Sequence, residues 1–481
     1  EFDRCGGKVN ADFVDNSAGV DSSDHEVNIK ILLNPLVRDG ELTLKKRNTL
    51  LEAMTDDVAE HVLQHNYDQT LALTLARANA ASDLDAHERM MERLERDGRL
   101  DRKVEGLPAA EDVRELKEQG AGLTRPEIAV LISYAKITLF DQLVASKVPD
   151  DPHFIAMLEG YFPDQLQPYA APMKGHRLKR EIIATVLAND MVNLGGPTFM
   201  HRAAESTGAD AAAVARAFEA GRRIFRFADL TTRINALDNA APSTVQHLLH
   251  EEIIRLLRRQ TYWLARRSRA LQEDKAPTID QVIAGYQPGV DTLKEIVIDV
   301  ISEHEQRGVE ARMAAYIDGG APEDIARDVA RLRPLTSSSD VIDLSERRGW
   351  PLKAAAQLYH AVGSRFGFDV LRGAGGSISS NVHWDRLAVR RLIEDLYASQ
   401  QAIADQMADF AAKAGGALAK GVEEPGRDWA EGLADAWRTA NAEDVERADA
   451  AMEELQASGG WTLSKVAIAS TTLRELAQNA Q

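Results

Sequence analysis

The stretch Thr124-Arg-Pro-Glu-Ile-Ala-Val-Leu-Ile-Ser-Tyr-Ala-Lys136 decides how most of this chain folds. Thr124 with Glu127 three residues later is a capping box, a pattern that begins an α-helix. Pro126 falls in the first turn, where its missing N–H costs little. Apolar residues then recur at intervals of three and four as far as Leu143. This is the spacing of one buried helix face, so the stretch predicts a long amphipathic helix.

The same signals recur outward from this stretch. Ser243 with Gln246 and Thr278 with Gln281 repeat the start pattern. Apolar stripes at helical spacing are formed by Leu51, Met54, Val58 and Val62, and by Leu249, Ile253, Leu256, Leu257 and Leu264. No fixed repeat period stands out, so we do not predict a solenoid. We expect a large all-helical domain over residues 83–481, with a sub-boundary near 335–340 and a loop at Arg372-Gly-Ala-Gly-Gly-Ser377.

The opening segment has a different pattern. Lys8 to Val14 alternates loosely, which is typical of a strand, and Asn16 to Gly19 then has the composition of a tight turn. We expect breaks at Asn34-Pro35 and Asp39-Gly40. The sequence therefore predicts a mainly α chain in which a short α/β segment, residues 1–82, precedes the helical domain.

Composition narrows the class of protein. The 57 basic and 75 acidic residues give a formal charge of −18, which argues against a general nucleic-acid or anionic-membrane surface. Cys5 is the only cysteine, so an intrachain disulfide and a thiolate metal cage are excluded, and a reducing cytoplasm fits. No apolar run has the length of a membrane span. The first residues resemble no signal peptide and lack an initiator Met, so we expect a fragment or a processed chain.

The run Asn16-Ser-Ala-Gly-Val-Asp-Ser-Ser-Asp-His-Glu-Val-Asn28 combines small and polar residues. Small turn residues let a ligand approach backbone N–H groups closely. An ordinary capped turn leading into a helix explains the same residues without a ligand. Spacing alone leaves both interpretations open.

Several blocks of the chain resemble the large-subunit NAD-dependent glutamate dehydrogenases of bacteria. These blocks are Gly6 to Ile31, Leu42 to Gln69, Arg125 to Lys136 and Lys179 to Asn193, with weaker similarity past Tyr262-Trp263-Leu264. The resemblance implies that residues 1–82 end the NAD-binding catalytic domain, completing a Rossmann-like domain, and that residues 83–481 form a C-terminal helical domain. It also implies a cytoplasmic homo-oligomer that uses NAD to convert L-glutamate to 2-oxoglutarate and ammonium.

The resemblance assigns roles within the polar run. Across glutamate dehydrogenases, a turn Asn-Ala-Gly-Gly-Val followed by Ser and Glu lies where substrate and nicotinamide meet. Asn16, Gly19, Val20, Ser23 and Glu26 fall on the same spacing. By this resemblance, Asn16 hydrogen-bonds the nicotinamide carboxamide or the ribose, and Gly19 belongs to the same cofactor contact. Ser23 donates to the distal carboxylate of glutamate, Val20 packs against its methylene chain, and Glu26 is structural.

The sequence departs from the family pattern at Ser17 and Ala18, where the smaller enzymes carry Ala and Gly, so the local turn is expected to differ. The family's catalytic lysine and aspartate motifs have no match here, and neither GxGxxG nor a P-loop occurs. We therefore expect no catalytic residue in this chain, and no activity from it alone. A non-catalytic helical oligomerisation or regulatory module remains the alternative. An independent enzyme in the helical part lacks any recognisable nucleophile, metal or phosphate motif.

Two pairs of histidines have the spacing of possible metal ligands. His61 and His65 are four apart on an expected helix, but no third ligand is apparent and HExxH is absent. We interpret them as helix-surface or core histidines and predict no metal. His247 and His250, followed by Glu251 and Glu252, are expected to form a solvated face.

One basic cluster surrounds two aromatic residues, Tyr262 and Trp263. It consists of Arg255, Arg258, Arg259, Arg266, Arg267 and Arg269. Because the chain as a whole is acidic, we interpret the cluster as intramolecular salt bridges or a subunit contact. Binding of an anionic effector stays open as a second interpretation.

Overall fold

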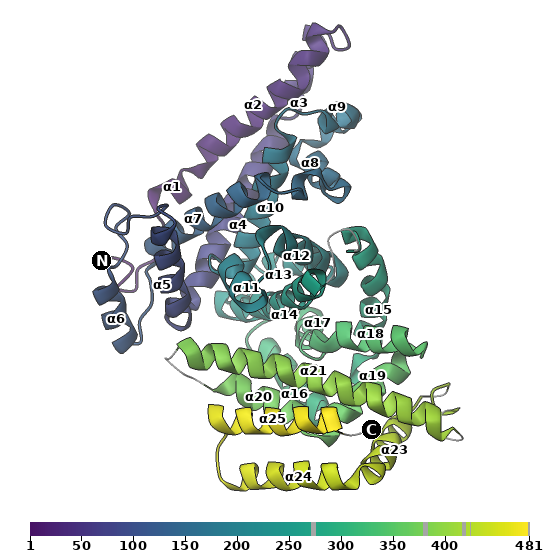
Figure 1. Ribbon diagram of the computed structural model, residues 1–481. Helices are drawn as coiled ribbons and strands as arrows, with labels where there is room; N and C mark the ends of the chain where they lie inside the picture. Colours follow the sequence, from purple (N-terminus) through teal and green to yellow (C-terminus); the bar gives the residue numbers. More distant parts are fainter. Residues whose placement is uncertain (271–275, 379–382, 416–419, 424, 480–481) are drawn as a thin grey trace. The chain divides into compact units, whose positions relative to one another are not determined.

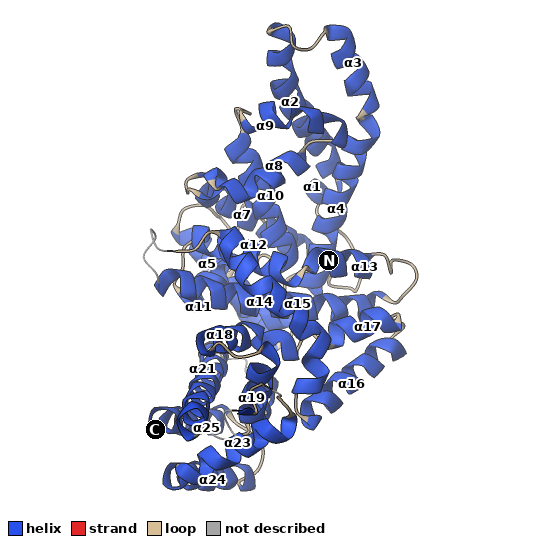
Figure 2. Ribbon diagram, turned by 90° about the vertical axis from the view of Figure 1, so that its right-hand side faces the viewer, coloured by secondary structure: helices blue, strands red, loops and turns tan. Residues whose placement is uncertain are grey.

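A computed structural model of the 481-residue chain describes residues 1–270, 276–378, 383–415, 420–423 and 425–479, without the side chains of residues 269, 270 and 383. The described residues contain helices and loops and no strand (Figure 2). This confirms the mainly α prediction, but the expected α/β segment is not found. Lys8 to Ala11 is irregular, and α1 (Asp12–Asp15) occupies the rest of the expected strand. A lone extended segment has no ladder to stabilise it as a strand.

The chain divides into two compact units. Unit 1 consists of Glu1–Gly221 and Leu257–Gln281, and unit 2 consists of Arg222–Leu256 and Val282–Gln481. Three helices continue across the division, namely α12 (Ala211–Phe225), α14 (Ser243–Ala270) and α15 (Ile279–Val300). The domain boundary near residue 82 and the sub-boundary near 335–340 stay predictions.

Besides α1 and its share of the crossing helices, unit 1 contains ten α-helices and three 3₁₀ turns among its described residues. They are α2 (Ser17–Arg38), α3 (Leu44–Ala53), α4 (Thr55–Ala78), α5 (Ala80–Arg96), α6 (Ala110–Glu118), α7 (Arg125–Val144), η1 (Val148–Asp150), η2 (Pro152–Phe154), α8 (Ile155–Tyr161), η3 (Asp164–Tyr169), α9 (Ala170–Lys174), α10 (Lys179–Gly195) and α11 (Phe199–Thr207). Its centre is α7, which packs on α10 and α4 (Figure 1).

The predicted capping box begins α7. The Thr124 N–H donates to Glu127 Oε2 over 2.7 Å, and the Glu127 N–H donates to Thr124 Oγ1 over 3.4 Å. The stripe that includes Ile128, Leu131 and Leu139 is buried. The sequence prediction for this helix is therefore confirmed from its first residue to its buried face.

Helices α2, α3 and α4 form an antiparallel hairpin at the start of unit 1. Residues near the beginning of α2 contact the middle of α4, since Asn66 Nδ2 donates to Ser17 Oγ over 3.0 Å. The expected break at Asn34-Pro35 is wrong, because α2 continues through Pro35 to Arg38. Proline lies in the last helical turn, where it removes one hydrogen bond and leaves the rest of the helix intact. The turn expected at Asp39-Gly40 is present, with Gly40 at φ +78°.

Unit 2 is also helical. Besides its shares of the crossing helices, its described elements are α13 (Phe227–Asn235), α16 (Glu303–Asp318), α17 (Glu323–Ala330), η5 (Pro334–Ser337), α18 (Ser338–Arg348), α19 (Leu352–Arg365), α20 (Phe368–Ser377), α21 (His383–Ala414), α23 (Arg427–Ala440), α24 (Ala442–Ala457) and α25 (Leu463–Asn479). Helix α25 lies between α21 and α24 and contacts both (Figure 1).

Two expectations fail in unit 2. The loop expected at Arg372 to Ser377 is the second half of α20, because Leu371 and Ala374 are buried and α20 packs against α21 and α25. Packing of a buried face can outweigh a glycine-rich sequence. The solvated face expected on α14 is wrong for His250 and Glu252, which are both buried. No helix in the described ranges is both long and apolar enough to cross a membrane.

Candidate functional site

Ser17 to Asn28 all lie in α2, so the tight turn expected at Asn16 to Gly19 is wrong. Asn16 precedes α2 as its N-cap residue, with φ −97° and no capping hydrogen bond from its side chain. Gly19 lies within the first turn. A helix places residues three, four and seven apart on one face. The sequence-predicted residues Asn16, Gly19, Val20 and Ser23 therefore share one face of α2, and all four are exposed.

This exposed face is open and polar, with apolar patches. Val20 is 74% exposed and Val27, two turns further on, is 48% exposed. A Cβ atom added to Gly19 would meet only Asn16 Oδ1, at 4.0 Å. Ser23 Oγ donates to the Val20 carbonyl over 2.8 Å, so this hydroxyl is close to the helix and can turn outward to another acceptor. The face offers an amide, a hydroxyl and a valine side chain to a ligand.

Helix α2 also accommodates the residues that depart from the family pattern. Ser17 Oγ accepts a hydrogen bond from Asn66 Nδ2, which also donates to the Val14 carbonyl over 3.0 Å. Ser17 therefore faces α4 rather than the exposed face. Ala18 is an ordinary helical residue, because no φ above zero is required there.

The opposite face of α2 is buried around His25. This imidazole is 0% exposed, and neither of its ring nitrogens has a hydrogen-bond partner. It stacks on the Tyr161 ring, with centroids 4.4 Å apart and planes at 12°. Tyr161 Oη accepts from Asn28 Nδ2 over 2.8 Å and donates to Asp24 Oδ2 over 3.0 Å. Tyr161 thus connects α8 to two turns of α2.

Two histidines meet one carboxylate on this side of α2. His65 Nδ1 of α4 lies 2.8 Å from Asp21 Oδ2, and His25 Nε2 lies 3.8 Å from Asp21 Oδ1. Burial lowers the pKa of His25 to about 4, although the Asp21 charge opposes this. The hydrogen bond to Asp21 raises the pKa of His65, against the effect of burial. Sequence reasoning missed this group because it treated Asp21 and His25 as part of a turn, whereas four-residue spacing on a helix brings them together.

A lysine lies close to the same group. Lys136 Nζ donates to Gln69 Oε1 over 3.1 Å. Burial lowers the pKa of Lys136 to about 8, against the charges of Asp68, Asp190 and Asp21. Acidic groups therefore surround this lysine, and at neutral pH the area combines carboxylates with one ammonium group.

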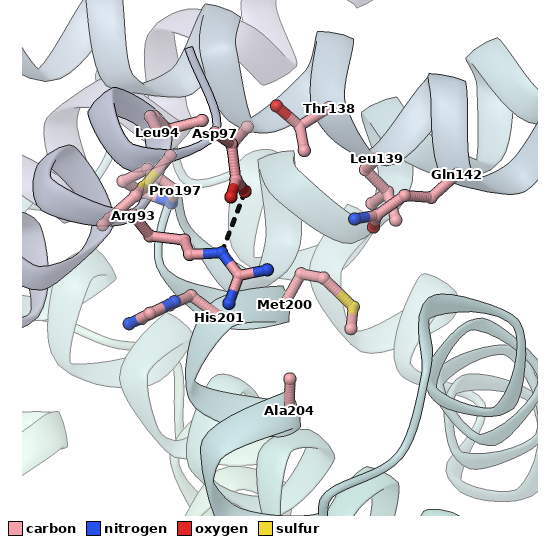
Figure 3. Close-up of a pocket in the computed structure, with 12 residues that line it drawn as sticks. Arg93, Leu94, Asp97, Thr138, Leu139, Gln142, Pro197, Met200, His201 and Ala204 are labelled. Atoms are coloured by element: carbon pink, nitrogen blue, oxygen red, sulfur yellow. Dashed lines mark hydrogen bonds and ion pairs between the residues drawn. The ribbon is translucent and has the colours of Figure 1, made fainter. Parts of the chain in front are cut away.

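A cavity of about 200 Å³ lies between α5, α7 and α11 in unit 1 (Figure 3). Its lining mixes apolar side chains with Arg93, Asp97 and His201. Arg93 Nε donates to Asp97 Oδ2 over 2.8 Å, and His201 Nε2 lies 3.1 Å from a Glu205 carboxylate oxygen. The charged groups of the lining are thus paired within the chain, which does not favour a site for a charged substrate.

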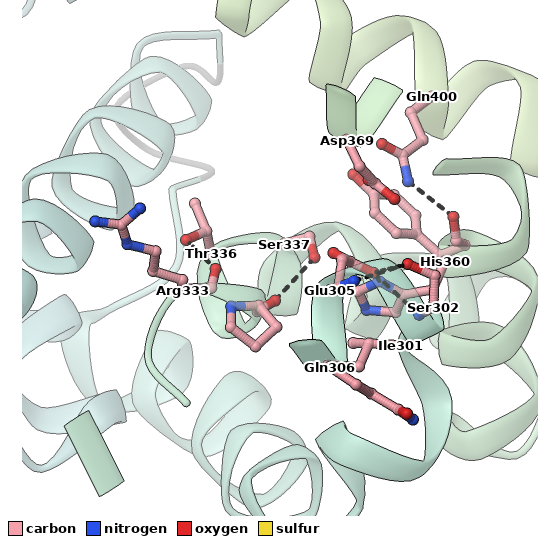
Figure 4. Close-up of polar contacts among 12 residues, drawn as sticks. Ile301, Ser302, Glu305, Gln306, Arg333, Thr336, Ser337, His360, Asp369 and Gln400 are labelled. Atoms are coloured by element: carbon pink, nitrogen blue, oxygen red, sulfur yellow. Dashed lines mark hydrogen bonds and ion pairs between the residues drawn. The ribbon is translucent and has the colours of Figure 1, made fainter. Parts of the chain in front are cut away.

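Unit 2 contains a buried polar cluster of its own (Figure 4). His360 Nδ1 lies 3.3 Å from Glu305 Oε2, and Arg372 Nη2 donates to Asp369 Oδ1 over 2.5 Å. Burial and the Glu305 charge raise the pKa of Asp369 to about 6. Gln400 Nε2 donates to the Tyr359 carbonyl over 2.8 Å. These groups are partnered by one another, which is typical of a structural network joining helices.

The basic cluster of the sequence makes contacts within the chain. Arg255 Nη2 lies 3.9 Å from Glu252 Oε1, Arg266 donates to Ser206 Oγ over 2.8 Å, and the Arg267 guanidinium lies over the Trp263 ring at 5.2 Å. An intramolecular salt bridge is therefore confirmed for Arg255, whereas Arg266 and Arg267 make other contacts within the chain. The side chain of residue 269 lies outside the described part of the structure.

Comparison with known proteins places nearly the whole chain beside one group of enzymes. The family model described as "Glutamate dehydrogenase, C-terminal" matches residues 120–475. The model described as "Bacterial NAD-glutamate dehydrogenase, catalytic domain" matches residues 1–76, which include the whole of α2. The exposed face of α2 thus falls in the part matched by the catalytic-domain model.

Three curated relatives carry the name NAD-specific glutamate dehydrogenase. The protein from Pseudomonas aeruginosa is 38% identical over 482 residues, covering 100% of this chain and 29% of its own length. The Halomonas elongata protein is 40% identical over 75% of this chain and 22% of its own length. The Mycobacterium tuberculosis protein is 32% identical over 99% of this chain and 28% of its own length. The chain therefore spans less than a third of the length of these relatives.

Proposed function

We propose, since this chain belongs to the bacterial NAD-specific glutamate dehydrogenase family, that it acts as the C-terminal part of such an enzyme. The reaction is the oxidative deamination of L-glutamate to 2-oxoglutarate and ammonium, with NAD as the hydride acceptor. Family membership supports this activity over a helical module without a catalytic role. The structural observation that carries the proposal is the common exposed face of Asn16, Gly19, Val20 and Ser23 on α2.

The residues present on α2 suit one end of NAD rather than the whole cofactor. The Asn16 amide can both donate to and accept from a carboxamide, and the missing side chain of Gly19 leaves room beside it. A phosphate-binding glycine fingerprint is absent from the sequence, so this chain offers nothing equivalent for the pyrophosphate. We therefore assign Asn16 and Gly19 to the nicotinamide end.

Substrate contacts would occupy the same face one turn further along. Ser23 Oγ would leave the Val20 carbonyl and donate to the distal carboxylate of glutamate, a charge-assisted hydrogen bond. The exposed Val20 side chain would cover the methylene groups. These residues bind and orient the substrate. The lysine and aspartate that move protons in this family would come from other parts of the enzyme, since their motifs have no match here.

The test is a paired substitution in the full-length enzyme, Ser23→Ala against Ser22→Ala. Both hydroxyls are exposed, and each donates to a carbonyl of its own helix, over 2.8 Å for Ser23 and 2.7 Å for Ser22. Only Ser23 shares the face of Asn16 and Val20. We expect Ser23→Ala to raise KM for L-glutamate roughly 10- to 100-fold, because a hydrogen bond to a charged group contributes about 1.5–3 kcal/mol. KM for NAD should stay nearly constant.

Ser22→Ala should leave both constants near those of the wild type. Equal effects of the two substitutions would show that the loss comes from the helix and not from a substrate contact. An unchanged glutamate response in Ser23→Ala would remove Ser23 from the site.

We also propose that the enzyme is a cytoplasmic homo-oligomer, in which the helical part braces the catalytic part or joins subunits. Family membership and a single cysteine support this proposal. Size-exclusion chromatography with light scattering of the full-length enzyme would measure the oligomeric state. A monomer at assay concentrations would contradict it.

A further inference from the structure

We propose that Asp21, His25 and His65 form a binding site for a divalent cation of the zinc class, on the side of α2 away from the proposed substrate face. The sequence alone shows no third ligand for His65. The structure supplies two further groups from α2. In the described part of the chain, no other group of three His, Cys, Asp or Glu residues brings its ligand atoms this close together.

The three ligand atoms have the spacing that a small cation requires. They all lie within 4.8 Å of one another, with His65 Nδ1 2.8 Å and His25 Nε2 3.8 Å from the two Asp21 oxygens. Zinc binds imidazole nitrogen and carboxylate oxygen at about 2.0–2.2 Å in a tetrahedron, which places neighbouring ligand atoms roughly 3.3 Å apart. Asp21 and His65 keep exposed side-chain fractions of 25% and 45%. Small side-chain rotations of these two residues would complete the geometry.

The state of His25 points independently to a ligand. Buried polar atoms are normally hydrogen-bonded, yet both ring nitrogens of this fully buried imidazole lack a partner. Its Nε2 atom faces the Asp21 carboxylate, and the ring is held by stacking on Tyr161. A cation bound at Nε2 would satisfy one of these nitrogens.

The surroundings favour positive charge and allow access. The carboxylates of Asp68 and Asp190 add their negative charges to that of Asp21 near His65. The local electrostatic field is therefore negative despite Lys136. The partial exposure of Asp21 and His65 gives the cation a route from solvent. Three protein ligands leave the fourth tetrahedral position for water.

A cation here would cross-link α2 to α4 without contacting substrate. Asp21 and His25 are one turn apart on α2, whereas His65 belongs to α4. They lie on the face opposite Val20 and Ser23. The site would therefore hold the helix that carries the proposed substrate contacts. Its existence does not depend on the proposed dehydrogenase activity.

The experiment is a titration of the metal-free 481-residue chain with Co²⁺, followed by visible absorption, and then displacement of Co²⁺ by Zn²⁺. The variants are Asp21→Asn and His65→Gln, which alter partly exposed side chains and retain similar size. The matched control is His201→Gln, since His201 also faces a carboxylate one helical turn away, Glu205, but is not joined by a third ligand. Circular dichroism of each metal-free protein verifies its fold.

We expect the wild type and His201→Gln to bind one equivalent with a tetrahedral Co²⁺ spectrum that Zn²⁺ abolishes. Each cluster variant should lose affinity by more than roughly 100-fold, beyond the 10- to 100-fold lost with outer partners of metal ligands. Zn²⁺ should raise the melting temperature of the wild type and not of the cluster variants. Absence of one-equivalent binding by the wild type, or equal affinity of wild type and folded cluster variants, would overturn the proposal. So would an equal loss in His201→Gln.

Discussion

Single buried imidazoles make the stability of this chain depend on pH. His87 of α5 is 1% exposed and lies beside Asp83 and Arg202, which are joined by a hydrogen bond of 2.5 Å. Burial lowers its pKa to about 4, against the attraction of Asp83. Burial likewise lowers the pKa of His25 and of His250 to about 4. All three are neutral in the folded chain at pH 7.

The direction of the pH effect follows from proton binding. An unfolded histidine takes up its proton near pH 6.5, whereas His87 in the folded chain stays neutral until about pH 4. The unfolded state therefore binds more protons between these values, and stability falls as the pH falls through this window. For one such histidine the loss is about 2 kcal/mol at pH 5 and about 3 kcal/mol at pH 4.

Replacing one of these buried histidines should reduce the loss of unfolding free energy at acidic pH. We expect His87→Gln to reduce the fall in unfolding free energy between pH 7 and pH 5 by about 2 kcal/mol, because glutamine does not titrate. Urea unfolding followed by circular dichroism at pH 7, 6 and 5 measures the change. The slope with pH is compared rather than the absolute stability, since the substitution itself can destabilise. Parallel curves for wild type and variant would contradict the assignment. His250→Gln provides a second, independent variant.

At the scale of elements, helix starts were predicted well from local residues. The capping boxes at Thr124 and Thr278 are both present, the latter with Thr278 N–H donating to Gln281 Oε1 over 2.9 Å. The residues that form a helix cap lie within four positions of one another, so the local sequence is sufficient to predict the cap. The strand expected at Lys8 to Val14 and the loop expected at Arg372 to Ser377 depended instead on distant partners. Packing against α21 and α25 decided the second of these segments.

Contacts between distant residues also limited what could be predicted of the candidate site. The resemblance located Asn16, Gly19, Val20 and Ser23, and the structure places them on one exposed face of α2. Their roles stay predictions. The Asp21 group escaped notice because His65 comes from another helix, and because a helical period was not applied to the polar run. Had α2 been predicted from its first turn, Asp21 and His25 would have been paired one turn apart.

Gly363 of α19 lies where this helix closely approaches α20 and α21. A Cβ atom at this position would lie 2.8 Å from Gln400 Nε2 of α21 and 2.9 Å from Asp369 Oδ1 of α20. Both atoms belong to the polar cluster of unit 2 (Figure 4). A methyl group there would force a hydrogen-bonded amide and a carboxylate to move.

Gly363→Ala should therefore destabilise unit 2 by about 1–3 kcal/mol, which is typical of overpacking. The matched control is Gly285→Ala in α15, also within a helix and in unit 2, where an added Cβ meets nothing within 4 Å. We expect this control to stabilise by about 0.5–1 kcal/mol through helix propensity. The melting temperature should therefore fall for Gly363→Ala and rise for Gly285→Ala. Stabilisation by Gly363→Ala would mean that Gln400 and Asp369 can move aside without destabilising the polar cluster.

At the scale of the whole molecule, each compact unit contains its own capped helices. Thr124 caps α7 of unit 1, and Ser302 caps α16 of unit 2, where the Glu305 N–H donates to Ser302 Oγ over 3.2 Å. The two caps share no hydrogen-bond partner. Yet α12, α14 and α15 run from one unit into the other without a break in the described residues. These continuous helices therefore determine whether unfolding of one unit spreads to the other.

We expect Thr124→Ala and Ser302→Ala to act on separate units, each with a loss of about 1 kcal/mol from its helix cap. Hydrogen exchange followed by mass spectrometry should show faster exchange in α7 for the first variant and in α16 for the second. The double variant should show the sum, because independent sites are additive within about 0.5 kcal/mol. If either single substitution accelerates exchange in both units, the crossing helices transmit unfolding and the chain is one cooperative body. Separate effects would instead establish that each unit is stabilised by its own core, so that unfolding cannot be described by a single transition.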